Sequence, residues 1–220
     1  MASYDPKITD FTNPVAPNLP LAPIQYDRQF QDQFENILRL YYNQLDNSFG
    51  SLLGPSGGKY LKFPYGAFSS NQDQTTTANT ATLMTLNTTD FSNDVSISLS
   101  KITVVNPGIY NLQFSVQLEN ADNAPQDTFI WLKQNGVDIV GSTGKVGMPA
   151  RKGVGDPFHS IFGWNYFVSM AAGDYIEIYW STTNVAVTIQ YYPASASPTK
   201  PATQSVVATM TFVSSLLQSP

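Results

Sequence analysis

The sequence predicts a mainly β protein, in which a jelly-roll β-sandwich head is preceded by an extended N-terminal arm and one long α-helix. Three observations predict this. Five prolines fall within the first 24 residues, apolar side chains recur every three or four residues from 26 to 49, and short alternating segments separated by turn residues follow from residue 63. The expected parts are the arm at 1–24, the helix at 25–53, a Gly-rich linker at 54–62 and the head at 63–215.

The prolines of the arm argue against helix and sheet, because proline has no amide hydrogen and biases the preceding residue towards extended geometry. Apolar side chains nevertheless recur between the prolines, at Phe11, Val15, Leu19, Leu21 and Ile24. A solvated tail rarely carries so many apolar residues. We therefore expect the arm to lie along another surface, with simple disorder as the alternative.

The predicted helix carries one apolar stripe with the spacing of a single helix face. Gly50 and then Gly54-Pro55 are typical of a helix end. We interpret the stripe as a surface that anchors the chain or joins it to copies of itself, because a Gly-rich joint suits two separate bodies; packing on the chain's own β domain is the alternative. The stripe consists of Tyr26, Phe30, Phe34, Ile37, Leu38, Tyr41, Leu45 and Phe49.

The head is expected to be β throughout. Apolar and polar residues alternate most clearly at 109–118, 174–182 and 204–214, as in strands with one buried face. Asn135-Gly136 is the strongest hairpin signal, because both central residues of a type I′ turn need positive φ. About ten short strands at this spacing predict a two-sheet jelly roll. The expected strands are 63–69, 80–87, 95–99, 101–105, 109–118, 128–134, 137–140, 160–169, 174–182, 185–192 and 204–214.

Composition narrows the classes of partner. Only 12% of the residues are charged, about half the usual share. A net charge of −5 argues against nucleic acid as a partner, and no apolar stretch approaches the ~18 residues of a membrane span. The chain has no cysteine and begins without the basic and apolar regions of a signal peptide, so we expect it to be made in a reducing cytoplasm.

Catalysis is not expected, and neither is a cofactor or a metal. His159 is the single histidine and cysteine is absent, so nucleophilic devices and metal sites lack groups, and His159 with Asp156 supplies too few ligands. Two carboxylates would suffice for glycoside hydrolysis, but most of the candidates fall in turns, where Asp stabilises the bend. These candidates are Asp122, Asp127, Asp138, Asp156, Asp174 and Glu177.

Binding is the stronger hypothesis. Residues 141–165 are expected to form a long loop, overlapping the strand expected at 160–169, and loops of that length in compact domains are usually functional or form interfaces. Packing at a trimer axis or against a neighbour is an equally weighted alternative. The aromatic content of 13% suits subunit faces and sugar stacking alike. The expected recognition residues are Lys145, Arg151, Lys152, Phe158, His159 and Trp164.

Five segments of the head occur in an order that resembles a known superfamily. They are Phe63–Phe68, Ile102–Tyr110 with its Asn106-Pro107-Gly108 turn, Trp131–Gly136 ending in Asn-Gly, Ala172–Ile176 with its Gly173-Asp174 turn, and Val206–Phe212. In this order they resemble the tumour necrosis factor/complement globular-head superfamily. The resemblance covers about 150 residues and implies a ten-stranded jelly roll that packs side by side with two copies of itself as a homotrimer.

The N-terminal region carries a second resemblance. The stretches Leu19–Tyr26 and Phe34–Asn47 look like the start of virion structural proteins of marine tailed bacteriophages, cyanophages above all. This resemblance implies that residues 1–49 dock on a particle and that the head projects from it. It would also account for the missing cysteines and signal peptide, because virions assemble in the host cytoplasm and leave by lysis.

The function expected is therefore a non-enzymatic bacteriophage virion protein, a homotrimeric fibre or decoration protein. It would be anchored to other virion proteins of the capsid or tail by its N-terminal segment. Its head would stabilise the particle or attach to a host-surface glycan or protein. The alternatives are a cellular carbohydrate- or protein-binding jelly-roll module and a small depolymerase.

Overall fold

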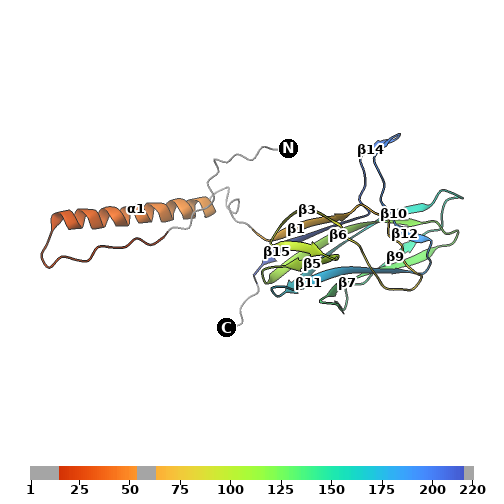
Figure 1. Ribbon diagram of the computed structural model, residues 1–220, viewed down its shortest axis with the longest axis horizontal. Coiled ribbons are helices and arrows are strands. Elements are labelled where there is room, and N and C mark those ends of the chain that lie inside the picture. Colours follow the sequence, from red (N-terminus) through yellow and green to blue (C-terminus); the bar gives the residue numbers. More distant parts are fainter. Residues whose placement is uncertain (1–14, 54–62, 216–220) are drawn as a thin grey trace. The chain divides into compact units, whose positions relative to one another are not determined.

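A computed structural model describes residues 15–53 and 63–215, the side chains of 51–53 excepted, and the chain divides into two compact units, Met1–Lys62 and Phe63–Pro220. The first unit contains one helix and the second an antiparallel β-sandwich (Figure 1). The predicted fold class is thereby confirmed. The first fourteen residues of the predicted arm and the predicted linker at 54–62 lie outside the described residues.

The single helix of the described chain, α1, spans Arg28–Leu53. Residues 15–24 before it form neither helix nor strand. Asp27 is the N-cap, because its Oδ1 accepts hydrogen bonds from the backbone N–H groups of Gln29 at 2.8 Å and Phe30 at 3.4 Å. The helix thus begins three residues later than the predicted start at 25. The sequence analysis followed the apolar spacing back to Tyr26 and overlooked this cap.

The apolar stripe of α1 has no covering within its own unit. Phe30 and Phe34 stack with ring centroids 6.2 Å apart, yet both remain partly exposed. Phe49 is 55% exposed, and Tyr26, which precedes the helix, is 83% exposed. Among the described side chains from 15 to 50, none is buried.

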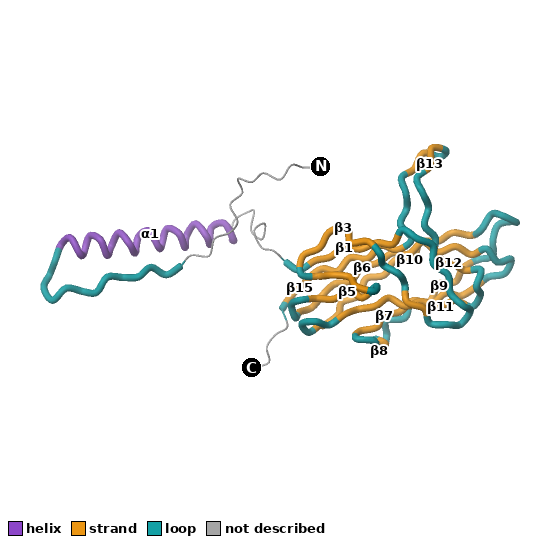
Figure 2. Tube along the Cα trace, in the orientation of Figure 1, coloured by secondary structure: helices purple, strands orange, loops and turns teal. Residues whose placement is uncertain are grey.

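The second unit stacks two antiparallel sheets face to face (Figures 1 and 2). The first sheet has the order β10-β6-β15-β1-β3, and β12 also pairs with β6. Because β6 lies between β10 and β15, neighbours in the sheet are far apart in sequence, as in a jelly roll. The strands of this sheet are β1 (Tyr65–Ser70), β3 (Thr88–Asn93), β6 (Gly108–Asn120), β10 (Phe158–Met170), β12 (Val187–Ile189) and β15 (Val206–Ser214).

The second sheet has the order β4-β5-β11-β7-β8, with β2 also pairing with β11 and β9 with β7. A separate two-residue ladder, β13 (Ser195–Ala196) with β14 (Thr199–Lys200), forms the hairpin that projects from the sandwich (Figure 2). The strands of the second sheet are β2 (Thr82–Leu83), β4 (Val95–Ser98), β5 (Lys101–Val104), β7 (Gln126–Gln134), β8 (Val137–Asp138), β9 (Gly144–Met148) and β11 (Tyr175–Thr182).

The core lies between the two sheets and follows from their alternating side chains. Along β6, every second residue from Tyr110 to Leu118 is buried. From the second sheet, Leu132 and Trp180 meet them and are almost completely buried. Burial of this kind contributes about 1.5–3 kcal/mol per large apolar side chain, so the alternation itself accounts for the sandwich.

Two predicted turns, Asn135-Gly136 and Gly173-Asp174, are present at the end of the sandwich where β1 begins and β15 ends. Hydrogen bonds join them to each other. Asn135 and Gly136 have φ values of 52° and 81°, as a type I′ turn requires. The carboxylate of Asp174 accepts hydrogen bonds from the side chains of Asn135 (2.8 Å) and Gln134 (3.0 Å) and from the backbone N–H of Ala171 (2.8 Å). These donors hold the pKa of Asp174 below its usual value.

At the opposite end of the sandwich, which we call the distal end, the chain turns back in loops 121–125, 149–157 and 183–186 (Figure 1). The prediction of a long loop over 141–165 is wrong. Residues 144–148 are strand β9 and residues from 158 onwards are strand β10, so that only 149–157 connect them. Strand β3 was not predicted either, because Phe91 is its single apolar residue among Thr, Asp, Ser and Asn, so that apolar and polar residues do not alternate.

Candidate functional site

The outward side of the first sheet is almost free of charge. Strands β10, β6, β15 and β1 contain one carboxylate, Glu119, one histidine, His159, and no lysine or arginine. We call the outward side of β10, β6 and β15 the uncharged face. Apart from Glu119 and His159 it presents Ile109, Asn111, Gln113, Ser115, Gln117, Ile161, Gly163, Asn165, Phe167, Ser169, Val207, Thr209 and Thr211.

Large apolar side chains stand among the amides and hydroxyls of this face. Ile161 is 67% exposed and Phe167 57% exposed, both on β10. A shallow hollow of about 270 Å³ lies beside them between β6 and β15. Exposed apolar groups next to polar but uncharged groups cost little to desolvate, and charge depletion is the compositional mark of an interface core. The lining of the hollow is Gln113, Phe114, Ser115, Val207 and Thr209.

Strand β10 also forms one edge of the first sheet, which makes this side of the molecule unusual. It is 13 residues long and pairs with β6 along its whole length. It contains no proline and no Asp, Glu, Lys or Arg, which are the residues that commonly protect an exposed strand edge from pairing. The long edge of β10 is therefore unprotected, and it lies beside the uncharged face.

The outward side of the second sheet has the opposite character. Each of its three lysines lies over an aromatic ring, with Nζ-to-centroid distances of 4.3 Å for Lys101 over Tyr175, 4.5 Å for Lys133 over Tyr179 and 5.7 Å for Lys145 over Phe129. We call this the lysine–aromatic face. The aromatic rings stabilise the lysine ammonium groups above them. This face is therefore suited to permanent contact with water.

The lysine–aromatic face also contains an aromatic pair and an ion pair. Trp131 lies beside Tyr179 with ring centroids 5.9 Å apart, and its Nε1–H donates to Asp138 at 2.7 Å. Lys133 reaches the same carboxylate at 3.4 Å. The polar and charged side chains of this face therefore bond to one another, and Val137 on β8 is an exposed apolar residue of this sheet, at 70%.

The six residues predicted for recognition do not form one surface. Phe158 and Trp164 point inward from β10 and pack against the core. Lys145 lies on the lysine–aromatic face, where its Nζ is 2.8 Å from Asp127 Oδ2. Arg151 and Lys152 lie in the loop 149–157, and Arg151 Nη1 donates to the Ala121 carbonyl oxygen at 3.2 Å. A recognition role for these side chains stays a prediction for each of them separately.

His159 lies on β10 at the distal end of the uncharged face, and not in a loop. Its Nδ1 is 2.9 Å from the Tyr192 hydroxyl and 3.6 Å from Glu119 Oε2, and Tyr192 also donates to Glu119 at 3.2 Å. Burial first, and then the charge of Glu119, raises the pKa of Tyr192 to about 12. Glu119 and His159, the two titratable groups of the uncharged face, are therefore both bonded to the Tyr192 hydroxyl.

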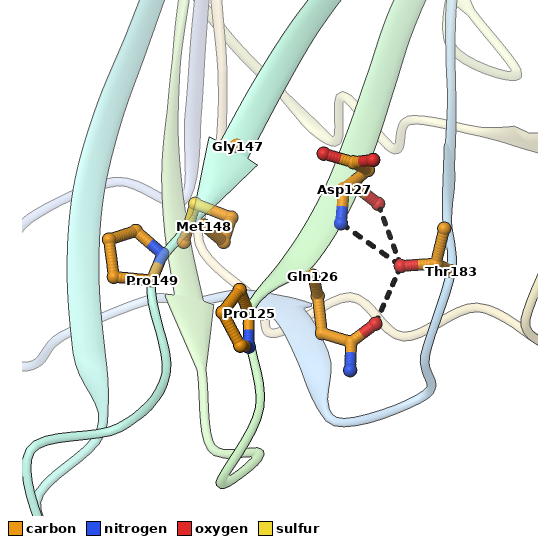
Figure 3. Close-up of a pocket in the computed structure, with 7 residues that line it drawn as sticks. All are labelled: Pro125, Gln126, Asp127, Gly147, Met148, Pro149 and Thr183. Carbon is orange, nitrogen blue, oxygen red and sulfur yellow. Dashed lines mark hydrogen bonds between the residues drawn. The ribbon is translucent and has the colours of Figure 1, made fainter.

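A second hollow, of about 620 Å³, opens at the distal end of the sandwich (Figure 3). Pro125, Met148 and Pro149 lie on one side of it, and Asp127 and Thr183 on the other (Figure 3). Its polar groups are fixed from behind, because Gln126 Nε2 and Asn184 Nδ2 both donate to Asp122 Oδ2, at 2.6 and 2.7 Å. The full lining is Pro125, Gln126, Asp127, Gly147, Met148, Pro149 and Thr183.

Two further observations on the described residues concern metal ions and membrane-spanning helices. No group of three or more His, Asp or Glu side chains within 15–53 and 63–215 is placed to hold a metal ion. The one helix of the described chain is not apolar enough to cross a membrane.

No family model matches the chain, and no curated protein matches it. The surfaces above are therefore interpreted from their own chemistry. The sequence analysis missed the uncharged face, although its signal was present: the strands expected at 109–118, 160–169 and 204–214 contain no Asp, Glu, Lys or Arg.

Proposed function

We propose that this chain is a non-enzymatic structural protein of a tailed-bacteriophage particle, a homotrimeric fibre or decoration protein located in the virion. Its N-terminal segment docks on other virion proteins of the capsid or tail. Its head stabilises the particle or attaches to the host surface. The observation that carries the proposal is the uncharged face with its unprotected edge strand, β10.

Self-association through this face explains both of its features at once. The edge of β10 in one copy packs against the face of β6 and β15 in the next, so that Ile161 and Phe167 leave water. Contacts between two different patches are heterologous, and they close into a ring when the rotation permits. The lysine–aromatic face remains outside, where its charges stay hydrated.

Three copies are favoured by the resemblance of the head to tumour necrosis factor/complement globular heads. That superfamily has ten-stranded jelly rolls that associate as trimers. In the described chain, ten strands contain four or more residues. They are β1, β3, β4, β5, β6, β7, β9, β10, β11 and β15.

The helix supports the anchoring role. The partly exposed apolar side chains of α1 lie at steps of three or four residues along one face, and its own unit leaves them unburied. Such a helix gains stability when its stripe packs on copies of itself or on another protein. The resemblance of Leu19–Tyr26 and Phe34–Asn47 to phage virion proteins favours a particle as the surface to which it binds.

Truncation tests the division of labour. A chain that begins at Gly54 is expected to remain folded and trimeric by sedimentation, but to be absent from particles purified after complementation of a phage that lacks the protein. The full-length chain in the same experiment is the control. A truncated chain that still incorporates into particles would contradict anchoring by the N-terminal segment.

A second candidate function is a cellular carbohydrate- or protein-binding jelly-roll module. The distal hollow favours it, because it offers fixed polar groups beside apolar rings without requiring a particle. Under this alternative the truncation at Gly54 leaves every activity of the protein unchanged, and antibodies against the head label no purified phage.

A further inference from the structure

We propose that the distal hollow is a binding site for an uncharged saccharide. Its volume of about 620 Å³ lies within the roughly 300–1,000 Å³ typical of small-ligand sites. Three separate segments converge on it: the start of β7, the end of β9 and the first residue after β11.

The polar side of the hollow is already rigid. Thr183 Oγ1 accepts a hydrogen bond from the Asp127 backbone N–H at 3.0 Å and donates to Gln126 Oε1 at 2.6 Å (Figure 3). The Thr183 backbone N–H donates to the Asp127 carbonyl oxygen at 3.0 Å. Gln126 is held in turn by Asp122. A site whose groups are fixed before binding loses little conformational entropy when a ligand enters.

The charges of the hollow favour a neutral ligand with hydroxyl groups. Asp127 Oδ2 is paired with Lys145 at 2.8 Å, so the carboxylate and ammonium charges offset each other. Both side chains remain accessible, at 40% and 58% exposure, and Asp127 Oδ1 has no donor among the described residues. Neighbouring hydroxyls of a sugar ring can donate to the carboxylate and accept from the ammonium, whereas an anion would meet Asp127 unfavourably.

The apolar side of the hollow completes the match. The rings of Pro125 and Pro149 flank it (Figure 3). A sugar ring has one side rich in C–H groups, which gains from contact with an apolar surface as its hydroxyls bind on the other side. A simple ion would gain nothing from contact with these proline rings.

Gly147 makes the hollow open to a direct test. It lies on β9, opposite Asp127 in the pairing with β7. A Cβ built on Gly147 meets no atom within 4 Å, so a larger side chain would extend into open space without disturbing the fold. Gly153, in the loop 149–157, has the same freedom but does not line the hollow, and it supplies a matched control.

The inference deepens the proposed function, because it rests on the distal end of the sandwich, opposite the end where β1 begins, being displayed on the particle. It names the class of host-surface molecule that this end would contact. The proposed trimer and the proposed saccharide site can be refuted independently of each other. Sedimentation of the same samples reports the trimer, and ligand binding reports the hollow.

The experiment is saturation-transfer difference NMR on the full-length protein with D-glucose, D-galactose and D-mannose at millimolar concentration, with N-acetylneuraminate as the anionic comparison. We expect at least one neutral sugar to receive saturation. Gly147→Leu is expected to abolish the signal and Gly153→Leu to leave it unchanged. Asp127→Asn is expected to weaken binding about tenfold or more, because a bond to a charged acceptor is lost.

Three results would overturn the proposal: no signal from any of the three neutral sugars, a signal from N-acetylneuraminate alone, or neutral-sugar binding that survives in Gly147→Leu. If the protein sediments as a trimer and yet binds none of the sugars, only the assignment of the hollow fails. If it binds sugar as a monomer, the hollow stands and the trimer does not.

Discussion

The two outer faces of the sandwich are made from equally regular strands and yet differ in almost every other respect. The strands of the first sheet contain no lysine or arginine, and Ile161 and Phe167 are exposed on its edge strand, β10. The second sheet places every lysine over a ring and pairs Trp131 with Asp138. The side chains of the second sheet bond to one another in water, and the first sheet is the face that we propose a second copy covers.

The difference shows where charge is tolerated. A lysine on the second sheet keeps its hydration and gains a ring beneath it, which contributes about 0.5–1 kcal/mol at an exposed site. A lysine on the first sheet would have to be removed from water when a second copy packs there, at a cost of several kcal/mol if it found no partner. The proposed assembly would account for the distribution of charge between the faces, and four substitutions test the difference between them.

The largest effect is expected from a charge placed on the uncharged face. Phe167→Lys should convert the trimer to monomer, because each contact would then bury an unpaired ammonium at a cost of about 3–5 kcal/mol. Sedimentation velocity measures the outcome. The isolated head should keep its fold, since Phe167 is 57% exposed there.

Val137→Lys is the matched control, because Val137 is 70% exposed on β8 of the second sheet. It is expected to leave the trimer intact. Dissociation by both substitutions, or by neither, would show that the two faces do not differ in the way described.

A loss of stability without a loss of assembly is expected on the lysine–aromatic face. Tyr179→Ala removes the ring contact with Trp131 and the ring beneath Lys133, which together contribute about 1–2 kcal/mol to the free energy of unfolding. Denaturant titration measures this change. The sedimentation coefficient should stay that of the wild type, and a shift to monomer would count against the assignment of this face to solvent.

A smaller effect is expected at the distal end of the uncharged face, and it depends on pH. Because the folded pKa of Tyr192 is about 12 and the unfolded value about 10, the protonated hydroxyl stabilises the fold below pH 10. That contribution is lost as pH rises through 12. Tyr192→Phe should lower the free energy of unfolding by about 1 kcal/mol at neutral pH, a value discounted for the partial exposure of the group.

The difference between wild type and Tyr192→Phe should shrink between pH 10 and 12, as followed by urea titration at each pH. His159→Gln serves as the comparison, because it removes the other partner of the Tyr192 hydroxyl and retains Glu119. A gap between wild type and Tyr192→Phe that is constant over this range would refute the shifted pKa of Tyr192.

The smallest effect is expected from Lys145→Gln, which breaks the ion pair with Asp127. Both side chains are well exposed, so the pair contributes less than about 0.5 kcal/mol and is screened by salt. Thermal unfolding at low and high ionic strength measures it. A loss several times larger would mean that the lysine–aromatic face depends on its ion pairs more than on its rings.

The parts of the fold that the sequence predicts are those set by local physics. The alternation along β6, the Asn135-Gly136 turn and the periodicity of α1 need only neighbours in sequence, and all three are confirmed. Strand β9 escaped prediction because two of its five residues are glycine, and glycine weakens any strand pattern. Its strand conformation comes from pairing with β7, which lies more than ten residues away in sequence.

The candidate sites were harder to predict, because they depend on which strands become neighbours. Trp164 looked like a surface aromatic, and only the alternation of β10 turns it inward. The distal hollow joins Asp127 to Thr183 across the sheet, and no local pattern connects two residues so far apart. The scarcity of charge on β10 was visible in the sequence, but its meaning required the strand to be placed at an edge.

Sedimentation equilibrium of the full-length protein measures whether other copies cover the uncharged face. We expect a single species with three times the 24.1 kDa mass of the chain. We also expect Phe167→Lys to sediment with the mass of one chain. A wild-type protein that stays monomeric at micromolar concentration would contradict the proposed assembly.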